Sequence, residues 1–537
     1  MNDQERIHAL EKRVEKLEEE LASIKSSQSS NVPTINKKRP ITVQKNINKK
    51  VITKKNEKDW EKEFGQVWLP RIFIFVLLIG VIWAFKAGTE LGLINEYVRV
   101  VAGFLAGGAM LLVGHIQSKK QHYVLSQVLL GGGVALFFVT TFSAHVLYGF
   151  LTLLLAFSIH VAVVALGLYL TIRYQSQSIG IVSSIGGFLV PFILNSSSGN
   201  VIFFVSYELL IFVAFMYIAT RRQLNRLYSV IIYGLHFAFL AFSVFEPMSN
   251  IITFGAIIQH VMLLLYFLFG YDLKKENSFA VLSTSVFVAL WAITSFNEFG
   301  YTFILLSMSI IYVVLALVIK RGNEVKAVLL SSVALILLIF FMKQYEASLG
   351  LLLLVQGAIV TYLGYRLFSK IQKFIGLVIY GIGLLFTLMN PIGAFISIEF
   401  VSWSVLMITL AGLYVLIKSA LPKKNDVIIP VKVAITIIGL LYISQLAQLL
   451  TVNVGTTLEP MVLSISWLLY AALLIVYGFY REDKVIRVVG IALILFTLLK
   501  VILIDLPTVS IVVRALLFLV LGTIGVAVSR LFYRKKS

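Results

Sequence analysis

The chain has 537 residues, of which 59% are hydrophobic and 13% are charged, and its mean hydropathy is +0.92. A soluble domain carries about 25% charged residues, so this composition excludes an ordinary water-soluble protein and predicts a membrane protein surrounded by lipid. The net charge of +20 would suit nucleic acid, but the basic residues lie between apolar stretches, and we expect no nucleic-acid partner. The absence of cysteine excludes disulfides, thiolate catalysis and cysteine-bound metals.

The first predicted element is a short coiled coil over residues 1–25. Its apolar residues alternate at spacings of three and four, the a/d pattern of a heptad repeat: Ile7, Leu10, Val14, Leu17, Leu21 and Ile24. Residues 7–24 are therefore expected to self-associate or to bind a partner helix. The alternative is a single amphipathic helix lying on the membrane surface.

Residues 26–59 form a predicted disordered linker, because they are polar, rich in lysine and almost without aromatic residues. Their positive charge predicts attraction to the anionic lipids of the cytoplasmic leaflet. Residues 60–68 begin and end with tryptophan and are expected to lie in the membrane interface, where tryptophan is favoured.

Residues 69–532 are predicted to form an all-α, polytopic transmembrane helix bundle whose partners are the membrane lipids. Apolar stretches of about 20 residues, one bilayer thickness of helix, alternate with short polar connections. About eighteen spans fit this pattern: Leu69–Phe85, Val98–Ile116, Val124–His145, Tyr148–Ile172, Ile179–Leu194, Val201–Ala219, Leu227–Val244, Ile251–Gly270, Phe279–Phe296, Tyr301–Ile319, Ala327–Met342, Leu349–Leu367, Phe374–Met389, Ile398–Ile417, Val427–Leu450, Met461–Tyr480, Val485–Ile504 and Val509–Phe532. Residues 533–537 form a basic tail.

The connections predict the topology, because basic residues gather in every second one, as the positive-inside rule requires. Lys119 and Arg222 lie in connections assigned to the inside, whereas Glu298 lies in one assigned to the outside. Both termini are therefore expected on the cytoplasmic side. The inner ends of successive hairpins recur about every 50 residues; hairpins with minimal loops and duplication of a two-helix unit both explain this period.

Few ionisable residues lie inside the predicted spans, and each is a functional candidate because charge is costly in lipid. Glu208 lies about 12 Å from the outer end of its span, and His160, His236 and His260 lie near the middle of theirs. Together they form a candidate intramembrane polar site for a proton relay, a cation or a substrate amine. The alternative is that each histidine bonds the helix backbone or a hydroxyl and holds the bundle together.

A second candidate site lies near the outer surface and would bind an anionic group such as a phosphate or a carboxylate. It consists of Lys500, Asp505, Arg514 and Arg99. The alternative for Asp505 and Arg514 is a structural ion pair across the last hairpin.

Glycines cluster at Gly103, Gly107 and Gly108, at residues 131–133, and at Gly186 with Gly187. Small residues let neighbouring helices approach closely, and this is the favoured interpretation. The alternative concerns the last pair, which is followed by Pro191: a broken helix there would line a substrate site.

Some runs of residues are distinctive beyond their composition. They are Gly131-Gly132-Gly133-Val134-Ala135, the run Ser184 to Pro191, the C-terminal Lys500, Asp505-Leu506, Arg514, Gly522 and Tyr533, and the entry Trp68-Leu69-Pro70-Arg71. With these runs the chain resembles a bacterial family of predicted multi-pass membrane proteins, domain of unknown function number 2339. The resemblance covers nearly the whole chain after about Glu61. It implies a multi-pass protein of the bacterial plasma membrane and carries no established activity.

The sequence contains no Gly-x-x-x-x-Gly-Lys-Ser/Thr motif, no His-Glu-x-x-His and no His/Cys metal set, so neither cofactor nor metal is expected. It favours a secondary transporter or flippase for an envelope-related or small polar substrate. One alternative is a membrane scaffold assembled through the coiled coil. Another is a membrane-embedded transferase acting on an envelope polymer, with Glu90, Glu96, His145 or His160 as the base.

Overall fold

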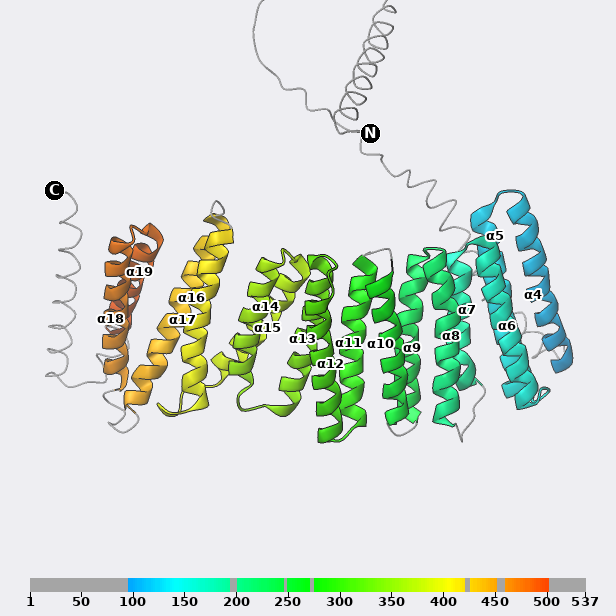
Figure 1. Cartoon of the computed structure of the whole chain (residues 1–537), viewed down its shortest axis with the longest axis horizontal. Helices are drawn as coiled ribbons and strands as arrows, with labels where there is room; N and C mark the ends of the chain where they lie inside the picture. Colours follow the sequence, from blue (N-terminus) through cyan, green and yellow to red (C-terminus); the bar gives the residue numbers. More distant parts are fainter. Residues whose placement is uncertain are drawn as a thin grey trace, which may run out of the picture. The chain divides into compact units, whose positions relative to one another are not determined.

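The structure is a computed structural model that describes residues 95–193, 200–245, 249–270, 275–420, 425–451 and 459–501. Within these ranges the chain forms sixteen α-helices and no strand (Figure 1). In chain order they are α4 (Glu96–Lys119), α5 (Tyr123–Phe142), α6 (Leu153–Tyr174), α7 (Gln177–Ile193), α8 (Val201–Arg221), α9 (Asn225–Phe245), α10 (Asn250–Phe269), α11 (Lys275–Ser295), α12 (Glu298–Val318), α13 (Asn323–Gln344), α14 (Leu349–Arg366), α15 (Lys370–Met389), α16 (Ile398–Ala420), α17 (Asn425–Thr451), α18 (Glu459–Tyr480) and α19 (Lys484–Lys500). A π-helical turn, Ser143–Leu147, follows α5.

Fourteen of the described helices are long and apolar enough to cross a membrane, while α7 and α19 are shorter, with 17 residues each. Large apolar side chains such as Leu154, Phe299 and Leu317 are exposed on helix surfaces, as expected where lipid covers them. The predicted all-α, polytopic architecture is therefore confirmed within these ranges. The predicted coiled coil, linker, interfacial segment, first and last spans and basic tail lie outside the described residues.

One predicted span begins later than the sequence suggested. The apolar run was expected to be helical from Tyr148, but α6 begins at Leu153. Gly149 has a φ of +64°, which no right-handed helix contains, and the side chain of Thr152 caps the helix by accepting from the backbone N–H of Leu155 at 3.4 Å. The apolar run therefore includes the whole connection between two helices.

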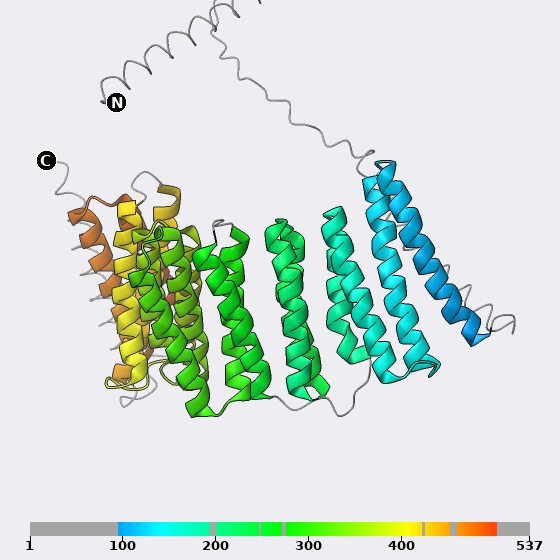
Figure 2. The ribbon, with the colours of Figure 1, turned by 45° about the vertical axis from the view of Figure 1, so that its right-hand side comes forward.

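Each described helix packs chiefly against the helices one or two places away in the chain. In both views the colours of the described helices run in chain order from one end of the row of helices to the other (Figures 1 and 2). Contacts of this local kind are typical of proteins built from stacked repeats. Consequently, any site in the described part of the chain is assembled from helices that are consecutive or nearly so.

The interface between α14 and α15 depends on glycines. A Cβ atom at Gly357 would lie 2.4 Å from the backbone nitrogen of Tyr380, and one at Gly376 would lie 2.5 Å from that of Thr361. A further glycine in each helix, Gly364 in α14 and Gly383 in α15, faces backbone atoms of the partner helix in the same way. Small residues let two helix backbones approach this closely in a membrane.

Most of the glycines singled out in the sequence also lie at close contacts, whereas Gly108 has nothing within 4 Å of its Cβ position. A Cβ at Gly107 would lie 2.5 Å from the ring of Phe137, and one at Gly186 would lie 2.4 Å from the ring of Phe138. Moreover, α7 is continuous from Gln177 to Ile193 and includes Pro191. The described structure thus matches the close-contact interpretation, and α7 has no break.

Five of the described hairpins close with the same left-handed turn. In each, a residue other than glycine has a positive φ: Gln121, Gln175, Gln223, Phe368 and Glu482. In the α8–α9 turn, the backbone N–H of Leu224 donates to the carbonyl of Ala219 at 2.8 Å, as in a Schellman motif. This bond satisfies a carbonyl at the end of α8, so the next helix starts after only three residues.

Successive hairpins are joined by polar contacts between residues about 50 positions apart. The backbone N–H of Arg226 donates to Gln177 across 49 residues, and Tyr233 bonds Ser283 across 50 residues. These separations equal the period found in the sequence. The period therefore corresponds to one helical hairpin packed on the next.

Candidate functional site

Three buried polar side chains on adjacent helices have atoms without any hydrogen-bond partner. Glu208 of α8 is fully buried, and neither of its carboxyl oxygens is bonded. His236 of α9 is 4% exposed, and neither of its ring nitrogens is bonded. Gln259 of α10 donates from its amide nitrogen to the carbonyl of Ile232 at 3.1 Å, but its amide oxygen has no partner.

These three groups lie at similar depth in their helices. Phe204 of α8 stacks on Phe242 of the antiparallel α9 with ring centroids 4.1 Å apart. Glu208, four residues further along α8 than Phe204, is therefore level with the turn of α9 that contains His236. Gly255 of α10 faces both Val205 of α8 and Phe239 of α9, which brings Glu208 level with residue 258 of α10 and hence with Gln259.

The surroundings of this site are apolar. The residues one turn from Glu208 on either side, Phe204 and Phe212, belong to the buried core that joins α5 to α11. His236 stacks on Phe287 of α11 with ring centroids 4.3 Å apart. An unbonded polar group in such surroundings costs several kcal/mol, so these atoms are placed for a ligand or water to bind.

His260 of α10 differs, because both of its ring nitrogens are bonded. The Thr284 hydroxyl of α11 donates to the carbonyl of Ala280 at 2.7 Å, so it must accept from Nδ1 of His260, also 2.7 Å away. Nε2 then carries a lone pair and accepts from the Tyr312 hydroxyl of α12. This assignment gives a neutral imidazole that links three helices, which is a structural role.

His160 of α6 lies apart from the other two histidines. Its Nδ1 donates to the carbonyl of Ala156 at 2.8 Å, and its Nε2 has no partner. The helix packs on α5, α7 and α8 but forms no substantial interface with α9 or α10. Of the four residues predicted for the intramembrane site, the structure therefore brings Glu208 and His236 to adjacent helices and places His236 and His260 against one helix, α11.

The second predicted site is only partly described, since Asp505 and Arg514 lie outside the described residues. Lys500 donates to the Pro460 carbonyl at 3.2 Å and to the Ser464 hydroxyl at 2.7 Å. Arg99 donates to the Tyr148 hydroxyl at 3.3 Å. Helix α4, which carries Arg99, and α19, which carries Lys500, share no substantial interface, so the described structure does not bring these two cations together.

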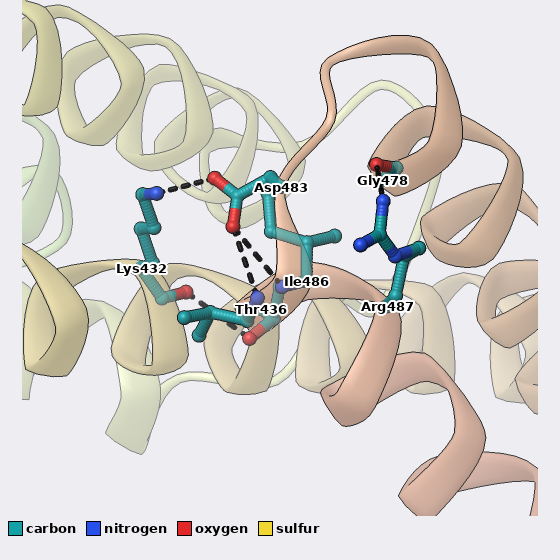
Figure 3. A network of polar contacts seen from close by, with 7 residues as sticks. Lys432, Thr436, Gly478, Asp483, Ile486 and Arg487 are labelled. Atoms are coloured by element: carbon teal, nitrogen blue, oxygen red, sulfur yellow. Dashed lines mark hydrogen bonds and ion pairs between the residues drawn. The ribbon is translucent and has the colours of Figure 1, made fainter.

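Sequence reasoning missed an ion pair between Lys432 of α17 and Asp483, which caps α19 (Figure 3). Asp483 also accepts from the backbone N–H groups of Val485 and Ile486 at 3.1 and 3.4 Å. Partial burial would raise the pKa of Asp483, but the bond and charge of Lys432, together with the two N–H groups, lower that pKa below its ordinary value. The signal in the sequence was a lysine inside an apolar run, 51 residues before an aspartate that precedes another run.

The described residues offer no metal centre, because none of them form a group of three or more His, Asp or Glu side chains that could hold an ion. Of the residues proposed above as alternative bases, Glu90 lies outside the described residues, and His160 is the buried histidine of α6. Glu96 is exposed in the first turn of α4, and Nδ1 of His145 bonds the Leu151 carbonyl at 2.7 Å.

Comparison with known proteins returns one family. None of the curated proteins or solved structures compared with the chain matches it. The family described as "Predicted membrane protein (DUF2339)" matches residues 65–441 and 404–534. These two segments overlap and together include every described helix. The chain therefore belongs to the DUF2339 family of predicted membrane proteins, as its resemblance to that family implied.

Proposed function

We propose that this membrane protein is a secondary transporter for a small polar substrate, which it binds between α8, α9 and α10. The observation that carries the proposal is the set of unbonded atoms on Glu208, His236 and Gln259. Secondary transporters bind their substrates near the middle of the membrane, and buried polar groups mark such paths. These groups would gain their missing bonds when a substrate binds.

The chemistry of the site indicates what the substrate presents. A carboxyl group and an amide oxygen accept hydrogen bonds, and an imidazole can donate from one nitrogen while it accepts at the other. Two of the three groups are thus acceptors, and the set favours a substrate with several N–H or O–H donors. An amine or a polyol fits this description better than a phosphate does.

The histidine at this site offers a test that separates function from structure. Replacing His236 with Phe removes two unbonded nitrogens and keeps a ring that can stack on Phe287. If His236 only fills space, H236F will be as stable as the wild type or more so, and as active. If His236 binds substrate, H236F will be stable and inactive.

The experiment compares full-length variants in cells that lack the chromosomal gene. Glu208→Gln and H236F are expected to behave like the null at normal membrane abundance, whereas Glu346→Gln, which changes an exposed carboxyl, is expected to complement. Purified protein in proteoliposomes is then given a cell extract, and mass spectrometry identifies the small polar molecules that enter. The proposal fails if both site variants complement fully.

The scaffold alternative predicts the opposite pattern. Deletion of residues 1–60 would then reproduce the null, while Glu208→Gln would be silent. A transferase that uses Glu96 would lose activity on replacement of that residue and would tolerate H236F. One set of strains thus separates the three functions.

We also propose that both termini face the cytoplasm of a bacterial cell. Basic residues support this topology, since Lys119, Arg173 and Arg221 each lie in the last turn of a described helix that ends on the same side. The absence of native cysteine makes the test clean. A cysteine placed at Ser118 should react with an impermeant maleimide only after cells are opened, and one at Asn297 should react in intact cells.

A further inference from the structure

A cavity of about 320 Å³ lies between the beginnings of α9 and α11. None of the three polar side chains of the proposed transport site lines it, although Ile232, whose carbonyl accepts from Gln259, does. The cavity lies at the ends of the spans, where lipid headgroups are found. Its volume is at the lower limit of known ligand sites. It therefore suits a small group rather than a large substrate.

The lining of the cavity is aromatic and acidic. Tyr228 and Tyr233 of α9 and Phe279 of α11 line it, and Glu276, the second residue of α11, supplies the only charge among the described lining residues. No basic side chain is among them. Aromatic faces and a carboxylate are the groups that bind organic ammonium ions.

The rings are held in place by their neighbours. Tyr228 is 6% exposed, and its ring lies 6.5 Å from that of Tyr266. The hydroxyl of Tyr233 is bonded to Ser283 at 3.1 Å, and its ring meets Phe287 edge to face. The two tyrosine rings are thus fixed before any ligand binds, which lowers the entropic cost of binding.

We propose that this cavity binds an alkylammonium group. The group could belong to the headgroup of a zwitterionic phospholipid at the membrane surface or to a free amine, since both present the same cation. The proposal does not depend on transport, because it involves neither Glu208 nor His236.

Choline is the probe, and its uncharged carbon isostere, 3,3-dimethylbutan-1-ol, is the matched ligand. The full-length protein in nanodiscs of phosphatidylglycerol, which lacks an ammonium group, is titrated with each by calorimetry. We expect saturable choline binding and at least tenfold weaker binding of the isostere. Equal binding of the two, or no saturable choline binding, would overturn the proposal, because the cavity would then be an apolar groove only.

Two variants test the residues. Glu276→Gln should weaken choline binding by about tenfold or more, and Tyr233→Leu should weaken it severalfold. Glu324→Gln is the matched control, since Glu324 is the second residue of α13 as Glu276 is of α11 but does not line the cavity. Retention volume on gel filtration shows that each variant is folded. If Glu324→Gln weakens choline binding as much as Glu276→Gln, surface charge alone attracts the cation and the assignment is wrong.

A third arm identifies the source of the cation. In nanodiscs of phosphatidylethanolamine, a lipid headgroup in the cavity would compete, so a drop in choline affinity assigns the site to lipid. Unchanged affinity assigns it to a free amine. Either result supports an ammonium site, provided that Glu276→Gln abolishes the difference between choline and its isostere.

Discussion

The closeness of α14 and α15 leads to a quantitative prediction for a single methyl group. In Gly376→Ala the new Cβ would lie 2.5 Å from the backbone nitrogen of Thr361 and 2.9 Å from its Cα. Backbone atoms of a helix cannot rotate away as a side chain can, so the two helices must separate. Gly381→Ala is the matched control in the same helix, because nothing lies within 4 Å of its Cβ position.

The expected magnitude follows from two opposing effects. Both alanines should gain about 1 kcal/mol from helix propensity. Only Gly376→Ala also incurs the cost of overpacking, about 1–3 kcal/mol, together with the loss of close contacts along the interface. Gly381→Ala is therefore expected to be neutral or stabilising, and Gly376→Ala should be less stable than Gly381→Ala by about 1–3 kcal/mol.

The assay is reversible unfolding of the full-length protein in bicelles, followed by tryptophan fluorescence and by steric trapping at sites on the two helices. A difference of about 1.4 kcal/mol changes the unfolding equilibrium tenfold at 25 °C, which this assay resolves. Equal stability of the two variants would refute the argument, since it would mean that the helices are not held at the distance given by the glycines.

Three further predictions concern turns, charge and hydrogen bonds. Glu482 has a φ of +57°, so Glu482→Gly should stabilise the α18–α19 hairpin by up to about 1 kcal/mol in thermal unfolding. Lys432 lowers the pKa of Asp483, so the stability that this pair adds is present above pH 3.8, the ordinary pKa, and is lost as pH falls through the lower pKa of the folded state. The free energy of unfolding should therefore differ less between pH 3 and pH 6 in Asp483→Asn than in the wild type. Tyr312→Phe leaves Nε2 of His260 without a donor and should lower the free energy of unfolding by about 1–3 kcal/mol in the same assay. An unchanged free energy of unfolding would contradict this, because it would mean that a water takes the place of the hydroxyl.

The helices could be predicted from the sequence because lipid imposes one simple rule, an apolar run long enough to cross it. That rule does not locate the ends of helices. Tyr148 is as apolar as its neighbours, and only the left-handed Gly149 and the cap at Thr152 move the start of α6 to Leu153. Helix ends depend on backbone geometry and single hydrogen bonds, to which hydropathy is insensitive.

The candidate site could be predicted only in part, and for a similar reason. Glu208 was identifiable because a carboxyl group in an apolar run is costly wherever it points. Gln259 and Thr284 were not predicted as site residues, since uncharged polar residues in spans most often bond their own helix or a neighbour. Whether the polar atoms of such a residue find hydrogen-bond partners depends on the neighbouring helix, and the sequence of one helix does not contain that information.

The contrast between two histidines illustrates how the neighbouring helix decides a role. His236 and His260 are the same residue type at buried positions of adjacent helices, and both face α11. Three positions along α11, nearly one turn, separate the residues that they meet, Phe287 and Thr284. The hydroxyl of Thr284 binds His260 into a complete network with Tyr312, whereas the ring of Phe287 supports His236 without bonding it. If both histidines served only to hold helices together, a hydroxyl at position 287 as well as at position 284 would bond both of them. The ring of Phe287 instead leaves the nitrogens of His236 without a partner, which is consistent with a histidine that binds a ligand.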